Sequence, residues 1–270
     1  MTAQTQVTLA RRARHRLRTR MSELPAIYLP FARHKYPGPS PEVISNATEL
    51  VIDGYTRSAS TFAVYALQLA QRAPVRLAHH LHAPAQLIEA ARNDVPALAV
   101  IREPEGAILS QLVREPGVAL RDALVAYARF YECLLPYRGN FVIADFEEVT
   151  KDFGTVIRRL NEKFGMALAE FQSSEQNVRA CFELIKLRGT LSPVLLGFES
   201  GTVTVDELQP EIAVLSSRLG PVPEAWIPSQ DRERSKAALR EEWGRPGLTG
   251  LRKRAWRVYE TFLGAADSRA

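Results

Sequence analysis

The sequence predicts an α/β fold built on a central parallel sheet. The first observation is that short, continuous apolar runs alternate along the chain with longer segments whose apolar residues recur at helical spacing. The second is that runs such as Ala97 to Ile101 lack polar residues on either face, as in strands that are covered on both sides. Strands alternating with helices indicate βαβ units, so we expect helices on both faces of the sheet in a three-layer sandwich.

The first half of the predicted sheet follows a proline-rich segment. Residues 24–43 contain five prolines and are expected to form an extended lead-in. A buried strand is then expected at 49–54, with a helix at 58–71 whose apolar residues share one face. A shorter second strand at 75–77 and a helix at 85–92 complete this half.

The second half of the sheet is expected to begin at a third strand, 97–101. Pro104 is suited to the first turn of the next helix, because its missing N–H would have no partner there in any case, and we expect this helix to reach about residue 113. The elements expected next are a helix over 120–134, a fourth strand over 140–144 and an amphipathic helix over 149–164 that ends at Gly165.

Past residue 170 the pattern is helical with irregular connections. We expect a hairpin or a long loop over 189–209, a loop around Pro221, Pro223 and Pro228, and helices over 230–244 and 251–263. No change in composition indicates a second domain. We therefore expect one domain over 46–270, preceded by a basic arm and lead-in over 1–45.

The net charge of +5 is concentrated near the start of the 270-residue chain. Six arginines precede the first acidic residue, Glu23, and they are Arg11, Arg12, Arg14, Arg16, Arg18 and Arg20. The remaining basic and acidic residues nearly balance. Such an arm is suited to nucleic acid, to anionic lipid or to an acidic partner, and the plainer interpretation is a solvated terminus.

Several classes of protein are excluded by composition. The two cysteines, Cys133 and Cys181, are too few and too far apart for a zinc finger or a disulfide framework, and they favour a reducing compartment. Apolar runs are too short for a transmembrane helix, and we expect no secretory signal. The expected location is cytoplasmic, with the basic arm suited to the inner face of a membrane.

The loop after the first predicted strand has the composition of an anion cradle. Gly54 is followed by Arg57 and by the hydroxyls of Ser58, Ser60 and Thr61, just before a helix. The first N–H groups of a helix lack partners and lie at the positive end of its dipole, which favours a phosphate. The lysine of an ATP-binding P-loop is missing, which weakens an ATP interpretation. The plainer alternative is that Ser58 only caps the helix.

The chain resembles the family of PAPS-dependent sulfotransferases through five segments in the family's order. YTRSASTF (55–62) is similar to the family's 5′-phosphosulfate loop, and RLAHHLHAP (76–84) to its RxxKTHLP segment. AVIREPEGAILSQL (99–112) resembles the 3′-phosphate motif, with a serine eight positions after the arginine. FVIADFEEVTKDF (141–153) and, more faintly, VRACFELIK (178–186) continue the match. The resemblance implies a P-loop-nucleotide-hydrolase-like topology.

The resemblance also implies a binding site for 3′-phosphoadenosine 5′-phosphosulfate. Arg57 stands where the family places a basic residue beside the bridging oxygen, and Arg102 and Ser110 match the pair that binds the 3′-phosphate. The full implied donor set is Arg57, Ser58, Ala59, Ser60, Thr61, Phe62, Arg102, Ser110 and Phe182, in which the two phenylalanines flank the adenine. No metal is implied. Ala59 replaces the family's loop glycine, so we expect this position not to need a positive φ angle.

The catalytic base implied by the resemblance is a histidine, and His80 aligns with it. Three histidines lie within four positions, so the assignment to His80 or His82 stays open. In an extended segment these two would share a face and His79 would oppose them. Many bacterial relatives use a carboxylate instead, which keeps Glu103 as a further candidate.

The function expected from the sequence is sulfuryl transfer to a hydroxyl or amine of a glycan, a lipid or a small molecule. His80 would accept the proton and Arg57 would stabilise the leaving phosphate. Two alternatives are a P-loop kinase that uses ATP and magnesium, and a nonenzymatic protein that binds nucleotides or a membrane surface. Nucleic acid is disfavoured as a partner, because the body has no basic patch with interleaved aromatic residues. The acceptor and the oligomeric state are left open.

Overall fold

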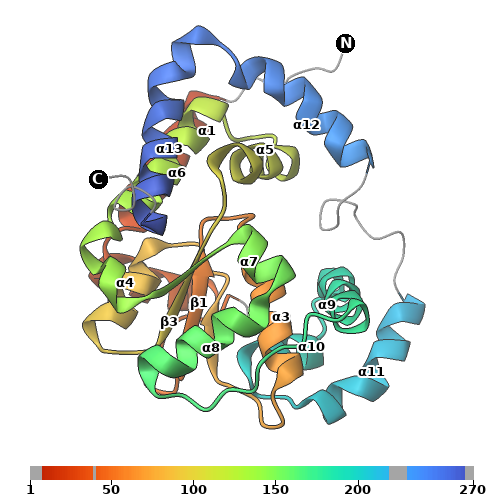
Figure 1. Ribbon diagram of the computed structural model, residues 1–270. Helices are drawn as coiled ribbons and strands as arrows, with labels where there is room; N and C mark the ends of the chain where they lie inside the picture. The colour runs from red at the N-terminus through yellow and green to blue at the C-terminus, as the bar shows by residue number, and fades with distance from the viewer. Residues whose placement is uncertain (1–7, 39–40, 219–229, 265–270) are drawn as a thin grey trace.

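Figure 1 shows the computed structural model of the protein, and the structure describes residues 8–38, 41–218 and 230–264. The described residues form a central sheet in which all neighbouring strands are parallel, in the order β2-β1-β3-β4. The strands are β1 (Leu50–Gly54), β2 (Leu77–His79), β3 (Ala97–Ile101) and β4 (Val142–Asp145). The expected α/β class and parallel sheet are therefore confirmed. The third strand has the predicted bounds, and the others shift by one or two residues.

Helices cover both faces of the sheet because the strands place apolar side chains on both of these faces. Ile52 and Leu98 belong to one buried cluster, and Val51 and Ala99 belong to the other. The first face is covered by α3 (Ser60–Ala70), α7 (Phe146–Lys151), α8 (Phe153–Phe164) and α9 (Glu175–Leu187). The second is covered by α4 (Pro84–Arg92), α5 (Pro104–Arg114), α6 (Leu120–Glu132) and α13 (Thr249–Leu263).

The strand order creates a switch point between β1 and β3. From β1 the chain passes through α3 to β2 at one edge, and from β2 it returns through α4 past β1 to β3. Right-handed crossovers that run in opposite directions place their helices on opposite faces. The loops that follow β1 and β3 therefore lead to opposite faces of the sheet, and ligands of open α/β sheets bind at such a point.

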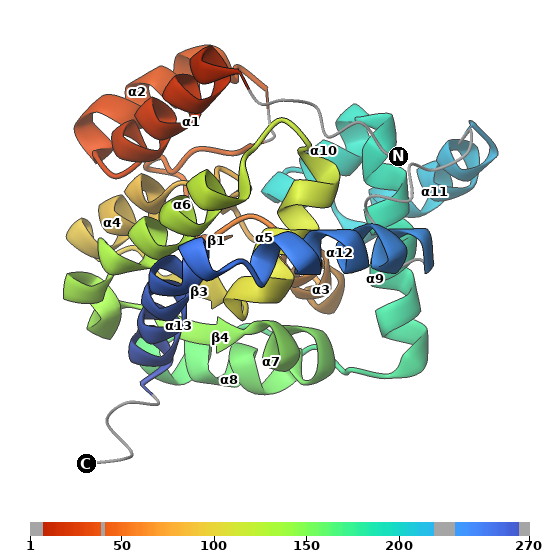
Figure 2. The ribbon, with the colours of Figure 1, turned by 90° about the horizontal axis from the view of Figure 1, so that it is seen from above.

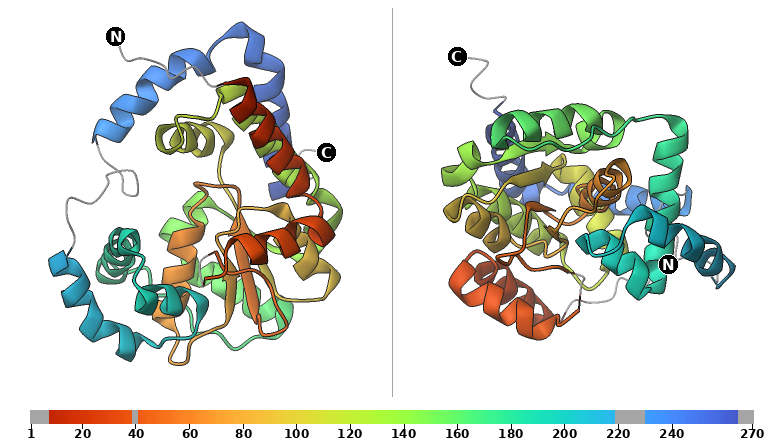
Figure 3. Two further views of the ribbon diagram at one scale, coloured as in Figure 1. Left: turned by 180° about the vertical axis from the view of Figure 1, so that it is seen from behind. Right: turned by 90° about the horizontal axis from the view of Figure 1, so that it is seen from below.

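The N-terminal region is helical, which corrects the expected extended lead-in. The structure has α1 (Leu9–Met21) and α2 (Pro25–Lys35). Helix α2 forms because Tyr28, Leu29 and Ala32 lie on one buried face, while Pro30 stays on the exposed face. Figure 3 shows both helices packed along the body of the protein from behind.

Helix α1 is held by charge rather than by an apolar face, since it has no buried residues. Arg12 and Arg16 donate to the carboxylate of Asp122 on α6 over 2.8 and 2.9 Å. The Asp122 side chain is only 3% exposed. Part of the basic arm is therefore neutralised against the body of the protein, which the sequence pattern did not indicate.

The predicted helix over 149–164 is two helices, because α7 ends before Asp152 and α8 begins after it. Asp152 leaves the helical conformation with φ −144°, and its carboxylate accepts from the N–H of Thr155 to cap α8. Gly165 ends α8 with φ 65°, as predicted.

The segment over 189–209 is helical, so the expected hairpin or long loop is wrong. Its elements are the 3₁₀ turn η2 (Arg188–Thr190), α10 (Pro193–Ser200) and the start of α11 (Val205–Arg218). Buried Leu195 and Phe198 hold α10 against α3 and β2. Helix α10 ends at Gly201, where φ is 78° and a Cβ would collide with the Val75 carbonyl.

The final helices bring the C-terminal part of the chain back over the sheet. The elements are α12 (Gln230–Trp243), the 3₁₀ turn η4 (Pro246–Leu248) and α13, and η1 (Leu135–Asn140) precedes β4. Helix α13 lies along α6 and α12 lies against α5 (Figure 2). Both predicted helices are confirmed, and the predicted loop at Pro221, Pro223 and Pro228 lies outside the described residues. Among the helices described, none is both long and apolar enough to cross a membrane.

Candidate functional site

The loop from β1 to α3 has an unusual backbone at the switch point. Arg57 and Ala59 have φ angles of 69° and 75°, with Ser58 between them. Ala59 is the residue that precedes the first turn of α3. The expectation that Ala59 avoids a positive φ is therefore wrong. The chain must turn back from the strand into the helix within a few residues, and left-handed residues make that reversal even without glycine.

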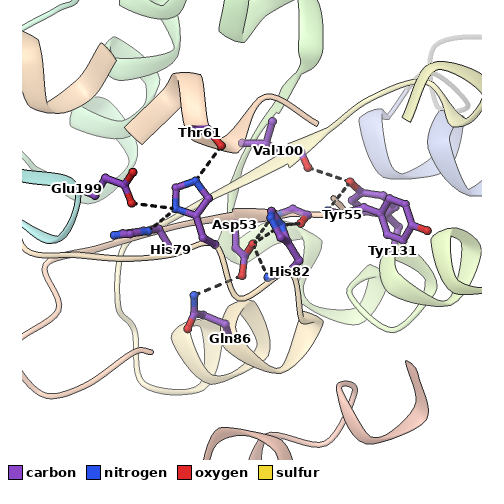
Figure 4. Close-up of polar contacts among 11 residues, drawn as sticks. Asp53, Tyr55, Thr61, His79, His82, Gln86, Val100, Tyr131 and Glu199 are labelled. Carbon is purple, nitrogen blue, oxygen red and sulfur yellow. Dashed lines mark hydrogen bonds and ion pairs between the residues drawn. The ribbon is translucent and has the colours of Figure 1, made fainter. Parts of the chain in front are cut away.

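Contacts with β3 and α6 hold the start of this loop in place. A Cβ at Gly54 would collide with the carbonyl of Val100, so only glycine allows the two strands to approach there. The hydroxyl of Tyr131 donates to that same carbonyl over 2.9 Å and accepts from the N–H of Tyr55 over 3.1 Å (Figure 4). The loop is thus supported by a rigid, buried frame.

Two arginines from different loops meet beside this cradle. Arg57 donates from Nε to the hydroxyl of Ser110 on α5 over 2.9 Å. Arg102, which follows β3, reaches the Arg57 carbonyl over 3.5 Å and lies 4.0 Å from the centre of the Phe146 ring. The predicted trio of Arg57, Arg102 and Ser110 is therefore brought together by the fold. Two arginines that line the same pocket favour an anionic ligand.

A pocket of about 250 Å³ opens where these groups converge. Seven of the nine residues expected at the donor site line it, namely Arg57, Ala59, Ser60, Thr61, Phe62, Arg102 and Phe182. Ser58 and Ser110 do not line it, although Ser110 contacts Arg57. Among the described residues, the buried hydroxyl of Ser60 has no hydrogen-bond partner. It lies in the first turn of α3, where an anion would accept from it.

The two aromatic residues expected to flank an adenine contact each other. The ring centres of Phe62 and Phe182 are 5.7 Å apart and the planes are tilted by 55°. A flat base between two rings needs about 7 Å, which is twice the usual carbon–carbon contact distance. A base would therefore lie against one side of this pair and not between the two rings.

The histidine segment after β2 is not extended, which overturns the face assignment made from the sequence. His80 and His82 have φ angles of 59° and 49°. As a result His79 contacts His80, with their Nδ1 atoms 2.5 Å apart. The carboxylate of buried Asp53 accepts from the N–H of His82 over 3.2 Å and from Gln86 over 3.3 Å, and so fixes this turn (Figure 4).

His80 lies behind the pocket wall. Its side chain is 5% exposed, and its Nε2 is 2.9 Å from the hydroxyl of Thr61, which does line the pocket. Burial first, and then the charge of Arg188, lower the pKa of His80 well below its ordinary value. The same two causes lower the pKa of His79 to about 3. His80 is thus a neutral partner of Thr61 with little access to a substrate.

His82 has the better position for a base. Its side chain is 29% exposed and lines the pocket. Its Nδ1 lies 2.9 Å from the carbonyl of Gly54, and a carbonyl can only accept, so Nδ1 carries the proton. The other ring nitrogen, Nε2, is then left with its lone pair available. The reserve candidate Glu103 instead accepts from Arg102 over 3.2 Å and does not line the pocket.

A buried polar cluster supports the histidines from the other side. Glu199 on α10 is fully buried, accepts from Arg188 over 2.7 Å and from Tyr65, and lies 3.8 Å from Nδ1 of His80. Ligand atoms of His79, His80 and Glu199 lie within 4.8 Å of one another, as in a metal site. The charge of Arg188 already neutralises this carboxylate, and it would repel a cation. The cluster therefore fits a support for His80 better than a metal site.

Several pocket residues were missed by sequence reasoning. Arg114 ends α5, and Lys236 on α12 is buried and paired with Glu233 over 2.6 Å. Thr150 on α7 also lines the pocket. Helix α12 lies far along the chain and reads as a polar surface helix, so no local signal places it here. For Arg114 the sequence does offer a signal, because it is a basic residue at the end of the helix that follows β3.

Comparison with protein-family models, with curated proteins and with solved structures found no match for this chain.

Proposed function

We propose that this protein is a sulfotransferase that uses 3′-phosphoadenosine 5′-phosphosulfate. The observation that carries the proposal is the meeting of Arg57, Arg102 and Ser110 beside the left-handed loop at the β1/β3 switch point. These are the residues that the family resemblance implies for the two ends of the donor. They come from separate segments of the chain, so their spacing in sequence alone did not require them to meet.

The donor would lie across the carboxyl ends of β1 and β3. Backbone N–H groups of the loop, the Ser60 and Thr61 hydroxyls and the dipole of α3 would hold its 5′-phosphosulfate. Arg102 would hold the 3′-phosphate, and Ser110 would orient Arg57. Each charge-assisted contact is worth about 1.5–3 kcal/mol. The strand order supports a P-loop-like topology in this proposal, because the cradle follows the strand next to the switch point.

Sulfuryl transfer then needs one base and one stabilised leaving group. The acceptor oxygen loses its proton to Nε2 of His82 and forms a bond to sulfur. The bond from sulfur to the bridging oxygen breaks, and its electron pair stays on the 5′-phosphate of the departing bisphosphate. Arg57 balances that charge without giving up a proton. This mechanism replaces His80 by His82 as the base and keeps His80 as a positioning residue for Thr61.

The kinase alternative has the same cradle but would need a cation for the terminal phosphates of ATP. No lysine follows Ala59 in the loop, and Ser60 and Thr61 stand there instead. The binding-protein alternative relied on a free basic arm. Since Arg12 and Arg16 both pair with the single carboxylate of Asp122, one of the arm's six positive charges is offset and two of its arginines are held against the body.

Thermal stabilisation by nucleotides tests the proposal. A ligand that binds only the native protein at a hundred times its Kd stabilises it by about 2.7 kcal/mol. We expect a rise in Tm with 3′-phosphoadenosine 5′-phosphate and a much smaller rise with adenosine 5′-phosphate at the same concentration. A rise with ATP and magnesium alone would favour the kinase. Equal effects of the bisphosphate and the monophosphate would contradict the assignment of the 3′-phosphate site.

A further inference from the structure

A second cavity shares part of its wall with the pocket described above. Its volume is about 110 Å³, it is open on one side, and residues of α1, α6 and the end of α5 contribute to its wall. Thr56 and His82 line both this cavity and the larger pocket. A group bound in either cavity would therefore face the same imidazole ring.

The orientation of His82 makes this shared wall chemically useful. Its Nδ1–H is used by the Gly54 carbonyl, which leaves Nε2 as the nitrogen that can accept a proton. The left-handed backbone of His82 and its N–H bond to Asp53 hold the ring in that place. A hydroxyl group of a molecule in the smaller cavity would thus lie beside a base that also faces the larger pocket.

The lining of the smaller cavity is about half polar and half apolar, and it carries both signs of charge. Arg18 of α1 offers N–H donors, and Glu115 at the end of α5 offers carboxylate oxygens. Among the described residues, the buried Nδ1 of His15 has no hydrogen-bond partner. Burial lowers the pKa of His15, so this ring is neutral. Phe130 adds one aromatic ring to the wall.

We propose that this cavity binds the acceptor, and that the acceptor is a small neutral polyol such as a sugar ring. The inference rests on the proposed function. A sugar presents hydroxyls that both donate and accept, which matches the Arg18 guanidinium, the Glu115 carboxylate and the unpartnered ring nitrogen of His15. A second carboxylate in the lining, that of Glu23, is already paired with Arg129. At about 110 Å³ it is smaller than a cavity of about 150 Å³ that holds benzene, so it would take one edge of a sugar ring while the rest of the ring or glycan extends through its open side.

Other acceptor classes fit the lining less well. A phenol or a sterol would place an apolar body against Arg18 and Glu115, which would lose their hydration without gaining a partner. Arg18 would attract an anionic acceptor that Glu115 repels, and the reverse holds for a cationic one, so the two charges together give no preference for a charged acceptor.

The basic arm has a role within the fold, because α1 provides one wall of the cavity.

Binding of methyl β-glucoside, measured by saturation-transfer NMR without any nucleotide, tests the inference directly. We expect binding to the wild-type protein and an affinity at least about tenfold lower in Glu115→Gln, because a charge-assisted hydrogen bond is lost. Glu175→Gln is the matched control, since Glu175 is an exposed residue of α9. Binding of 4-nitrophenol in place of the glucoside would overturn the inference, as would wild-type affinity in Glu115→Gln.

The bisphosphate measurement separates this inference from the proposed function. If the bisphosphate raises Tm but the glucoside does not bind, the donor site stands and the acceptor inference fails. If the glucoside binds in the Glu115-dependent way but the bisphosphate has no effect, the polyol site stands and the sulfotransferase proposal fails. If both bind, radiolabelled sulfuryl transfer to the glucoside should show a KM for the glucoside about tenfold higher in Glu115→Gln. The KM for the donor should stay within twofold.

Discussion

Replacing Ala59 by glycine tests whether the cradle loop stores backbone strain. The φ of 75° at Ala59 lies in the left-handed region, which costs an L-residue roughly 1–2 kcal/mol and costs glycine nothing. Two effects act against glycine. Its freedom in the unfolded chain costs about 0.4–1 kcal/mol, and removal of a half-buried methyl group costs about 0.4 kcal/mol. We therefore expect Ala59→Gly to leave the free energy of unfolding unchanged or to raise it by up to about 1 kcal/mol.

Ala63→Gly is the matched control, because it makes the same change one turn further along α3. Ala63 is helical and fully buried. Glycine costs about 1 kcal/mol in a helix interior, and the lost methyl group costs about 0.8 kcal/mol. This variant should therefore lose about 2 kcal/mol. The two glycine variants should differ by roughly 2 kcal/mol, which is about 4–8 °C in Tm for a protein of this size.

Urea unfolding followed by circular dichroism measures both free energies under the same conditions. If the two substitutions destabilise the protein equally, the left-handed conformation of Ala59 carries no strain and the reasoning fails. If Ala59→Gly alone lowered the free energy of unfolding by more than 1 kcal/mol, the stabilising contacts of the Ala59 methyl group would outweigh the strain of its left-handed conformation.

Four further predictions concern the site and its supports. Arg102→Ala should weaken binding of 3′-phosphoadenosine 5′-phosphate by tenfold or more and leave adenosine 5′-phosphate nearly unaffected, as isothermal titration calorimetry can check. His82→Ala should lower the turnover of labelled donor by at least a hundredfold with little change in donor affinity. His80→Gln should lower the turnover by a smaller factor. The reverse order would restore His80 as the base. Because the pKa values of His79 and His80 are lowered in the native state, the unfolded chain binds more protons below pH 6.5. As the pH falls below 6.5, the free energy of unfolding should therefore decrease by up to about 1.4 kcal/mol per pH unit for each histidine. A free energy of unfolding that stays constant from pH 7 to 5 would contradict this. Burial of Asp122 opposes its ionisation, but hydrogen bonds and charge from two arginines outweigh this effect and lower its pKa. The stability that Asp122 contributes is present above its unfolded pKa and is lost as the pH falls through its lower native pKa. Asp122→Asn should therefore have a lower Tm than the wild type at pH 7. The difference in Tm between the two proteins should be smaller at pH 3.

Much of the sheet and part of the site could be predicted from local patterns. Strand 97–101 is continuous and apolar because both faces are buried, and such runs have few other uses in a chain of this composition. The placement of Arg57 and Arg102 beyond the ends of β1 and β3 followed from the rule for open parallel sheets. Their actual contact, through Ser110 and the Arg57 carbonyl, confirms that these residues are neighbours.

Three of the errors share one physical origin, which is that a nonlocal contact outweighed a local preference. Five prolines between residues 24 and 43 suggested an extended chain, but the buried face of α2 stabilised a helix. The segment over 189–209 lacks a strong helical period, yet Leu195 and Phe198 bury against α3. The histidine segment was treated as extended, whereas hydrogen bonds to Asp53 hold it in a turn.

The sequence by itself determined the α/β class, the order of the strands along the chain and which residues follow each strand at the carboxyl edge. Hydrophobic periodicity and turn residues are local properties, because each depends on residues that are close together in the sequence. Only the tertiary structure decided that His82, and not His80, faces both cavities. That choice depends on the Gly54 carbonyl, on Thr61 and on the buried Glu199, which belong to other segments of the chain. Side-chain access is set by what packs around a residue, and no spacing in the sequence encodes it.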